Sequence, residues 1–200
     1  MRNLTTLKIY GDVVSGNCLK VKYTADILGL AYEWQAIDII KGESRTEEFL
    51  ALNPGGQVPA IELGDGRVLA QSNAIIQYLA EGTELLPGDA FARAQVNSWL
   101  FWEQYSHEPY IAVCRFAMVY QGKPREGREE WRVERGEQAL DHMERALAGR
   151  DWLAQATFTI ADIALLAYTR LAPEGGFELA GQPNIEQWIA RCEARLGLGG

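Results

Sequence analysis

The stretch Asn53-Pro54-Gly55-Gly56-Gln57-Val58-Pro59-Ala60 decides the fold of the first part of this 200-residue chain. It places a Val-Pro bond at the entrance to an apolar run. The trans preference of an X-Pro bond is only about 0.5 to 1 kcal/mol, so this position favours a cis peptide. A cis bond before Pro59 turns the backbone N–H and C=O of Val58 outward. We therefore expect these two groups to pair with a peptide.

A second polar stretch, Gln71-Ser72-Asn73-Ala74-Ile75, follows soon after. Ser72 precedes an apolar-periodic run and is predicted to be the N-cap of a helix. A free helix N-terminus attracts carboxylates, because its open N–H groups and the helix dipole both favour negative charge. Ser72 could also be a helix cap with no other role. Because it occurs together with the Val58-Pro59 stretch, we favour a role in binding a ligand.

Residues 1–81 alternate between strand and helix patterns. Asp65-Gly66 is expected to supply the positive φ values of a hairpin turn. The predicted order is a strand at 7–11, a helix marked by 19–28, a strand at 32–39, a helical turn at 47–52, a hairpin at 60–63 and 67–70, and a helix from 72. This βαβαββα order is that of a thioredoxin-like domain.

Residues 82–90 contain two glycines and a proline and interrupt the periodicity, so they are predicted to be a linker. Residues 91–200 are predicted to form an all-α helical bundle domain, and the fold class is therefore α+β. Thr159 and Asp162 have the spacing of a capping box at the start of an almost wholly apolar helix, which should be central. The other helical segments expected are 91–120, 126–149 and the region around Trp188.

Composition restricts the function classes. The net charge of −8 and the pI of about 4.9 argue against a nucleic-acid or anionic-membrane partner. No basic leader with an apolar core and no bilayer-spanning run is visible. The chain has three widely spaced cysteines, which are Cys18, Cys114 and Cys192. An odd number of distant cysteines suits reduced thiols in the cytoplasm, so we expect a cytoplasmic protein.

The N-P-x-G-Q-V-P-A stretch, the polar-Ser-x-Ala-Ile turn and the segment Phe158-Thr159-Ile160-Ala161-Asp162-Ile163-Ala164 together resemble the cytosolic glutathione S-transferase family, including its bacterial, theta-like, phi-like and beta-like members. The resemblance covers nearly the whole chain. It implies a homodimer in which glutathione, as co-substrate, lies along the thioredoxin-like domain. A small hydrophobic electrophile would sit over it, against the helical domain, and accept the glutathione thiolate.

The resemblance also implies roles for individual residues. Val58 would pair its backbone with the cysteinyl part of glutathione, and Pro59 would be the cis proline. Gln71 and Ser72 would hold the γ-glutamyl end. Many family members have a carboxylate where this chain has Gln71, and a neutral amide supplies no counter-charge to the γ-glutamyl ammonium, so glutathione affinity is expected to be modest. Weaker candidates, for the glycyl carboxylate, are Gln57 and Lys41.

Three residues at the predicted start of the first helix could activate the thiol. Lowering a thiol pKa of about 8.5 by two units requires about 2.7 kcal/mol of preferential stabilisation of the anion. We rank Ser15 first as hydroxyl donor, because Ser15 with Lys20-Val21 repeats the phi-like S-x-x-x-x-[RK]-V spacing. Asn17 is second as amide donor. Cys18 is third, since it matches the cysteine of beta-like enzymes and a helix start would lower its pKa.

The electrophile is expected to face the aromatic segment 99–110. An apolar cleft with few polar groups suits a hydrophobic substrate, and Tyr105, His107 and Arg115 are its candidate polar residues. Trp99 and Trp102 are more typical of a core. His107 and His142 are too far apart in the sequence to indicate a metal site, and no metal is predicted.

Two alternatives to glutathione conjugation stay open at this point. The first is a glutathione-dependent thiol or peroxide reductase that works through Cys18. The second is a binding or scaffold protein that has the fold without the chemistry, for which Gln71 is the best support.

Overall fold

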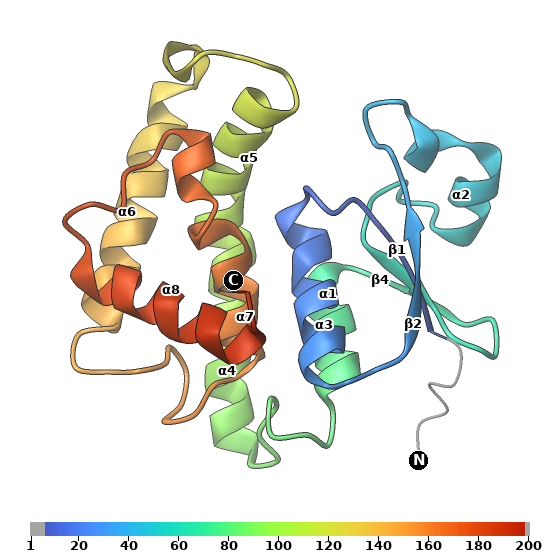
Figure 1. Ribbon diagram of the computed structural model, residues 1–200, viewed down its shortest axis with the longest axis horizontal. Helices are drawn as coiled ribbons and strands as arrows, with labels where there is room; N and C mark the ends of the chain where they lie inside the picture. The colour runs from blue at the N-terminus through green and yellow to red at the C-terminus, as the bar shows by residue number, and fades with distance from the viewer. Residues whose placement is uncertain (1–6, 199–200) are drawn as a thin grey trace. The chain divides into compact units, whose positions relative to one another are not determined.

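A computed structural model describes residues 7–198, which belong to two compact units that divide the chain between Glu81 and Gly82. The first unit combines a sheet with helices, and the second is helical (Figure 1). The α+β fold predicted from the sequence is confirmed. Among the described residues, no helix is both long enough and apolar enough to cross a membrane.

The first unit is built on a mixed sheet with the strand order β2-β1-β3-β4. β1 (Leu7–Gly11) pairs in parallel with β2 (Tyr32–Ala36). β3 (Ala60–Glu62) is antiparallel to both β1 and β4 (Val68–Ala70). Because a parallel pair needs a crossover connection, helix α1 (Gly16–Ile27) links β1 to β2.

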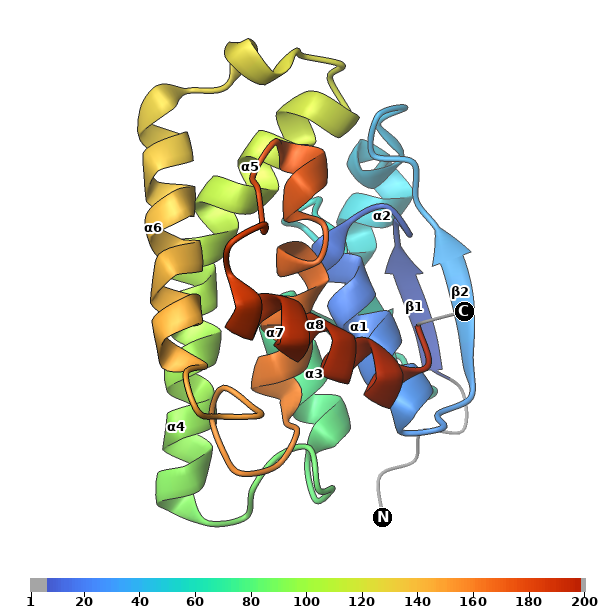
Figure 2. The same cartoon turned by 60° about the vertical axis from the view of Figure 1, so that its left-hand side comes forward.

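Helices cover both faces of this sheet. α1 and α3 (Ser72–Ala80) lie side by side on one face, and α2 (Glu47–Leu52) lies on the other (Figures 1 and 2). The short 3₁₀ turn η1 (Glu43–Arg45) leads into α2. The fully buried apolar residues of α1 recur at helical spacing, and they are Cys18, Val21 and Ala25.

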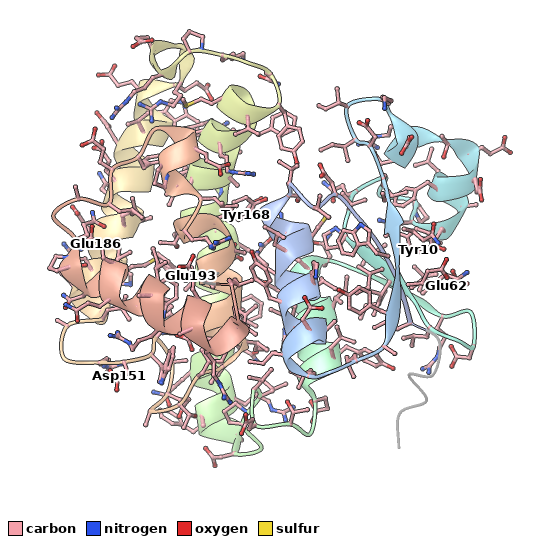
Figure 3. The ribbon with its side chains drawn as sticks, viewed as in Figure 1. Tyr10, Glu62, Asp151, Tyr168, Glu186 and Glu193 are labelled. Atoms are coloured by element: carbon pink, nitrogen blue, oxygen red, sulfur yellow. The ribbon has the colours of Figure 1, made fainter. Side chains whose placement is uncertain are left out.

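A polar cluster lies on the sheet face that carries α2. The Tyr10 hydroxyl donates to the Glu62 carboxylate at 2.8 Å, and the Lys8 ammonium lies 3.4 Å from the same carboxylate (Figure 3). The Tyr10 ring packs edge-on against Phe49 of α2, with 6.2 Å between centroids. Burial and the Glu62 carboxylate raise the pKa of Tyr10 to about 12, so its hydroxyl remains a donor.

Two predicted details of this unit are corrected. The strand predicted at 32–39 ends at Ala36, because the Asp38 side chain accepts the backbone N–H groups of Ile40 and Lys41, both at 3.0 Å, and bends the chain. The hairpin turn has a positive φ only at Gly66 (82°), whereas Asp65 was expected to share it. The bonds between Leu63 and its neighbours at 66 and 67 show a three-residue loop that ends in a left-handed glycine.

The second unit consists of helices joined by loops, of which the one over residues 147–159 is long. The single segment predicted at 91–120 is two helices separated by a π-helical turn, and the segment predicted at 126–149 is shorter than expected. The elements are α4 (Ala90–Trp102), the π turn η2 (Glu103–His107), α5 (Glu108–Val119), η3 (Arg125–Gly127), α6 (Glu130–Ala146), α7 (Ile160–Thr169), η4 (Ala172–Gly175) and α8 (Pro183–Leu196).

Helix α7 is the centre of the second unit, and all ten of its residues are buried. The predicted capping box is confirmed: Thr159 caps the helix, and the Asp162 carboxylate accepts the Thr159 N–H at 3.0 Å. The same carboxylate accepts the Leu153 N–H at 2.9 Å and the indole N–H of Trp188 at 3.0 Å. Asp162 therefore joins α7 to α8 and to the loop before α7.

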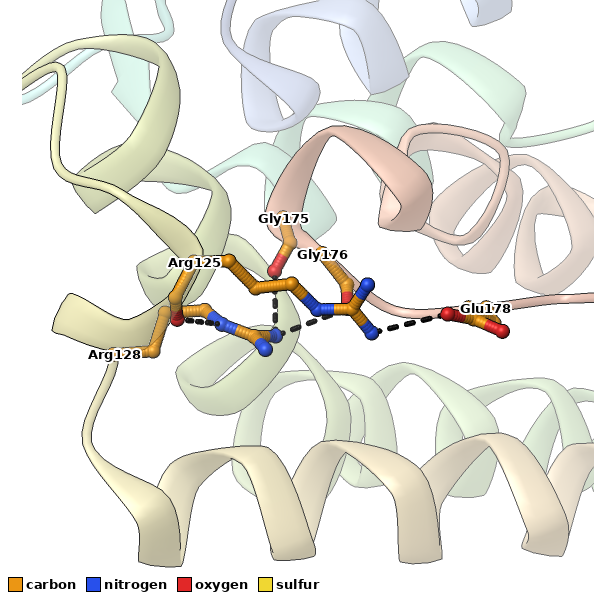
Figure 4. Close-up of polar contacts among 5 residues, drawn as sticks. All are labelled: Arg125, Arg128, Gly175, Gly176 and Glu178. Atoms are coloured by element: carbon orange, nitrogen blue, oxygen red, sulfur yellow. Dashed lines mark hydrogen bonds and ion pairs between the residues drawn. The ribbon is translucent and has the colours of Figure 1, made fainter.

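The loop after η4 is fastened to the connection between α5 and α6 (Figure 4). The Arg128 guanidinium donates to the carbonyls of Gly175 and Gly176 at 2.9 and 3.1 Å. Arg125 pairs with Glu178 at 3.1 Å. These bonds lie at the end of the unit where η4 packs on α5.

Candidate active site

The loop before Pro59 is held in place by the side chain of Asn53. The Asn53 Nδ2 donates to the carbonyl of Gln57 at 2.8 Å, and its Oδ1 accepts the Gly55 N–H at 3.2 Å. Asn53 is only 8% exposed, so the loop is anchored in the interior. The bond between Val58 and Pro59 is cis, as predicted.

Val58 lies between this loop and the first residue of β3. Within residues 7–198, neither its backbone N–H nor its C=O takes part in a hydrogen bond. A half-buried residue with both backbone groups open suits an extended peptide, whose main chain could pair with the N–H and C=O of Val58 just before β3 begins.

The start of α3 differs by one residue from the prediction. Gln71 has a φ of 72°, the single positive value among non-glycine residues of 7–198, and its carbonyl accepts the Ile75 N–H at 3.0 Å. Gln71 is therefore the N-cap, and the prediction that Ser72 is the cap is wrong. Ser72 is the first helical residue. The Gln71 side chain is exposed beside the helix N-terminus.

The start of α1 lies directly against the start of α3. Ser15 is the N-cap of α1 in extended conformation, and its hydroxyl does not cap the helix. The Asn17 Oδ1 accepts the Ser72 hydroxyl at 3.0 Å and the Lys20 ammonium at 2.8 Å. The residues predicted for the two ends of the site are thus in direct hydrogen-bond contact.

Cys18 does not have the low pKa expected of a cysteine at a helix start. Its side chain is fully buried on the core face of α1. Burial raises the pKa of the Cys18 thiol to about 11, although hydrogen bonds from the Asp12 backbone and the Ser15 side chain act in the opposite direction. The prediction of a reactive thiolate at Cys18 is therefore wrong, because the desolvation cost exceeds the help from the helix start.

The two weaker glutathione candidates are on the surface. Lys41 is 76% exposed and pairs with Asp38 at 3.0 Å. Gln57 is also exposed, and its carbonyl is the acceptor for Asn53. Both could reach a carboxylate in solvent without losing an interior contact.

The three electrophile candidates have different surroundings in the second unit. Tyr105 is 81% exposed. His107 is fully buried, and its Nε2 lies 3.0 Å from the Thr169 hydroxyl of α7. Arg115 is 4% exposed and pairs with Glu174 at 2.7 Å. The contacts of His107 and Arg115 tie helices together within the unit.

Two aromatic residues of α4, Trp99 and Trp102, are half-buried and pack against α6. The rings of Trp99 and Trp102 are 5.3 Å apart, and both contact the His142 ring of α6, at 5.7 and 4.9 Å. In the part of the chain that the structure describes, no three His, Cys, Asp or Glu side chains form a group that could hold a metal ion.

Comparison with known proteins identifies the family. A profile of the glutathione S-transferase N-terminal domain matches residues 14–81, and one of the C-terminal domain matches residues 109–195. Glutathione S-transferase 3 of Zea mays is 35% identical over 96% of this chain and 91% of its own length. The chain belongs to the glutathione S-transferase family. Human glutathione S-transferase theta-2B is 29% identical over 96% of this chain and 82% of its own length.

Solved structures of this family have the same fold. A glutathione S-transferase from Pseudomonas fluorescens superimposes with a TM-score of 0.90 at 51% identity, over 94% of both chains. A glutathione transferase from Pseudomonas putida superimposes with a TM-score of 0.82 at 26% identity, over 98% of this chain and 92% of that one, and its structure holds one glutathione disulfide per subunit. Family membership supports glutathione transferase activity in general.

Sequence reasoning missed two residues of the site. Asn53 was part of the quoted stretch, but its role in bracing the loop was not predicted, although Asn before Pro-Gly is typical of such turns. Lys20 was noted only for its spacing from Ser15. Its complete burial could not be predicted, because lysine is almost never fully buried.

Proposed function

We propose that this transferase conjugates glutathione to a small hydrophobic electrophile. The observation that carries the proposal is the 3.0 Å hydrogen bond between Ser72 and Asn17. It joins the α3 start, assigned to the γ-glutamyl end, to the α1 start, assigned to the thiol. Glutathione is a short tripeptide, so its subsites must adjoin each other in this way. The open backbone of Val58 supports a cysteinyl subsite in the same unit.

In the proposed reaction the glutathione sulfur loses its proton to solvent and attacks an electrophilic carbon. A C–S bond forms, and a leaving group departs with its electron pair. Ser15 donates its hydroxyl to the sulfur, and the Asn17 amide is the second donor. One or two aimed donors at a helix N-terminus can supply the roughly 2.7 kcal/mol that a two-unit pKa decrease requires.

The reductase alternative is less well supported, because Cys18 is buried. Such an enzyme needs a thiolate that substrate can reach, whereas the Cys18 thiol is buried and its pKa is raised to about 11. The scaffold alternative requires that glutathione fail to bind. Titration calorimetry at millimolar glutathione tests it directly, because a heat-silent titration would favour the scaffold.

Substituting Gln71→Glu should tighten glutathione binding about tenfold. Gln71 is exposed at the N-terminus of α3, and glutamate has the same size and shape. A carboxylate would make the bond to the γ-glutamyl ammonium charge-assisted, which is roughly twice as strong as a neutral bond. Titration calorimetry at low salt measures the change in Kd. The control Gln138→Glu, on the exposed side of α6, adds the same charge elsewhere and should leave the Kd for glutathione unchanged. If wild type and Gln71→Glu bind glutathione equally tightly, Gln71 is not part of the glutathione site.

We propose a homodimer that uses the exposed side of α4. Phe91 and Phe101, near the two ends of this helix, are 74% and 73% exposed. Large aromatic side chains are enriched in protein interfaces, so two of them exposed on one helix favour a partner surface on this side. In a two-fold assembly the same face of a second copy would cover it.

Phe101→Glu should raise the dimer dissociation constant at least about 100-fold. The substitution replaces a large apolar contact with a charge, and two-fold symmetry places a like charge in the facing copy. Sedimentation velocity at a series of concentrations measures the change. Gln187→Glu, at an exposed position of α8, should leave the constant unchanged. A wild-type protein that sediments as a monomer at micromolar concentration would contradict the proposed homodimer.

The electrophile class and the cell compartment remain proposals. The aromatic composition of α4 and α5 supports a hydrophobic electrophile. Tyr105, His107 and Arg115 remain candidates for its site. Three buried cysteines, unpaired with one another, fit a cytoplasmic location, as expected from their number and spacing.

A further inference from the structure

Lys20 is a fully buried lysine that is hydrogen-bonded to a residue of the candidate active site. Its side chain has no exposed area, and its Nζ donates to the Asn17 Oδ1 at 2.8 Å. Burying an ammonium group costs several kcal/mol of solvation, which hydrogen bonds only partly return. A methionine of similar length would fill the same space without that cost. Stability alone therefore does not explain a lysine here.

The lysine determines which way the Asn17 amide points. An ammonium group can only donate hydrogen bonds, so the Asn17 atom 2.8 Å from it must be the oxygen. Ser72 donates to the same oxygen at 3.0 Å. A carbonyl oxygen has two lone pairs, and these two donors use both. The orientation of the Asn17 side chain is thus fixed from α1 and α3 together.

The same bond also changes the strength of the amide as a donor. A cation at the carbonyl oxygen draws electron density from the amide nitrogen. The Nδ2–H groups become more acidic, as expected of cooperative hydrogen-bond chains in a low-dielectric interior. The effect is local, because it passes through one side chain in the first turn of α1.

We propose that Lys20 is a positioning residue for the thiol: with Ser72 it holds the Asn17 oxygen inward, so that the polarised Asn17 Nδ2 donates to the glutathione sulfur. This inference rests on the proposed function and deepens it, since it names how the second donor is prepared. Lys20 touches neither substrate nor sulfur in this account. Its whole effect passes through Asn17.

Lys20→Met should raise the pKa of the bound glutathione thiol by about one unit. The ultraviolet absorbance of the thiolate, titrated against pH on the glutathione complex, measures this pKa. The kcat for conjugation of an activated aryl halide should fall about tenfold at neutral pH and recover at alkaline pH, because one pKa unit is a tenfold change in thiolate. A merely structural role would lower kcat at every pH. Lys22→Met, on the half-exposed side of the same helix, should behave as wild type.

A double-variant cycle tests the route through Asn17. Asn17→Ala should raise the thiol pKa, and adding Lys20→Met to it should produce no further rise. Additive shifts would mean a direct electrostatic effect of Lys20 on the sulfur and would overturn the proposal. An unchanged pKa in Lys20→Met would overturn it too. If Lys20→Met does not fold, Lys20→Gln, which keeps a donor, replaces it and should show a smaller shift of the same sign.

The wild-type protein separates this inference from the proposed function. If it binds glutathione, shows the thiolate band and conjugates the halide while Lys20→Met is unaffected, only the role of Lys20 is lost. If the wild type shows neither binding nor the thiolate band, the conjugating function is overturned and the role of Lys20 with it.

Discussion

Ser15→Ala should lower the rate of aryl-halide conjugation about 100-fold at neutral pH. The hydroxyl at the N-cap of α1 does not cap the helix; its hydrogen bond is to the Cys18 thiol, a weak acceptor, and in the proposed complex it turns to the glutathione sulfur instead. Loss of one aimed donor from a developing or full anion typically costs 10²- to 10³-fold in rate. A two-unit rise in thiol pKa gives the same size of effect. Initial rates across a pH series measure it, and activity should return as the pH approaches the new thiol pKa.

The matched control for Ser15→Ala is Cys18→Ala. Cys18 is buried on the core face of α1, so its loss should change conjugation by no more than about twofold. The reductase hypothesis requires the opposite pattern, with turnover lost in the Cys18 variant and kept in Ser15→Ala. A Ser15→Ala enzyme with wild-type rates and wild-type thiol pKa would transfer the role of first donor to Asn17.

Asp162→Ala should lower the free energy of unfolding by about 3 to 5 kcal/mol. The carboxylate accepts buried donors from Leu153, Thr159 and Trp188, and alanine leaves them all without an acceptor. Each orphaned buried donor costs about 1 to 3 kcal/mol, and local relaxation recovers part of the sum. For a chain of this length the melting temperature should fall by about 10 °C. Thermal unfolding followed by circular dichroism measures the shift.

Asp141→Ala is the control for this second effect. Asp141 is an exposed residue of α6. Its carboxylate lies 3.5 Å from the Gln182 amide, which is the upper limit of a hydrogen bond. Its removal should change stability by no more than about 0.5 kcal/mol. If Asp162→Ala has the same melting temperature as Asp141→Ala and the wild type, the Asp162 carboxylate does not connect α7 and α8 as the contacts indicate.

Local sequence signals predicted the parts of the fold that depend on neighbours in the chain. The helix at 47–52, the cis bond before Pro59 and the box from Thr159 to Asp162 were each readable from a few adjacent residues. The end of β2 was not, because a single Asp38 side chain stops a run that still looks strand-like. The Ser72 error had a similar origin, since nothing local showed that Gln71 would adopt a positive φ.

The candidate site was predictable in its residues but less so in their environments. Helix position suggested a reactive Cys18, although its spacing from Val21 and Ala25 already placed it on the apolar face. His107 and Arg115 look like site residues because they are polar among aromatics. Their partners, Thr169 and Glu174, are distant in sequence, and only the folded chain brings them together.

The burial of all three cysteines has a chemical consequence for an enzyme of this kind. Compounds that react with glutathione also alkylate protein thiols. Desolvation raises the pKa of each cysteine, so almost no protein thiolate exists at neutral pH. For the proposed conjugation of electrophiles, this burial would protect the protein against self-inactivation, because the accessible thiolate during turnover would be the one that glutathione brings.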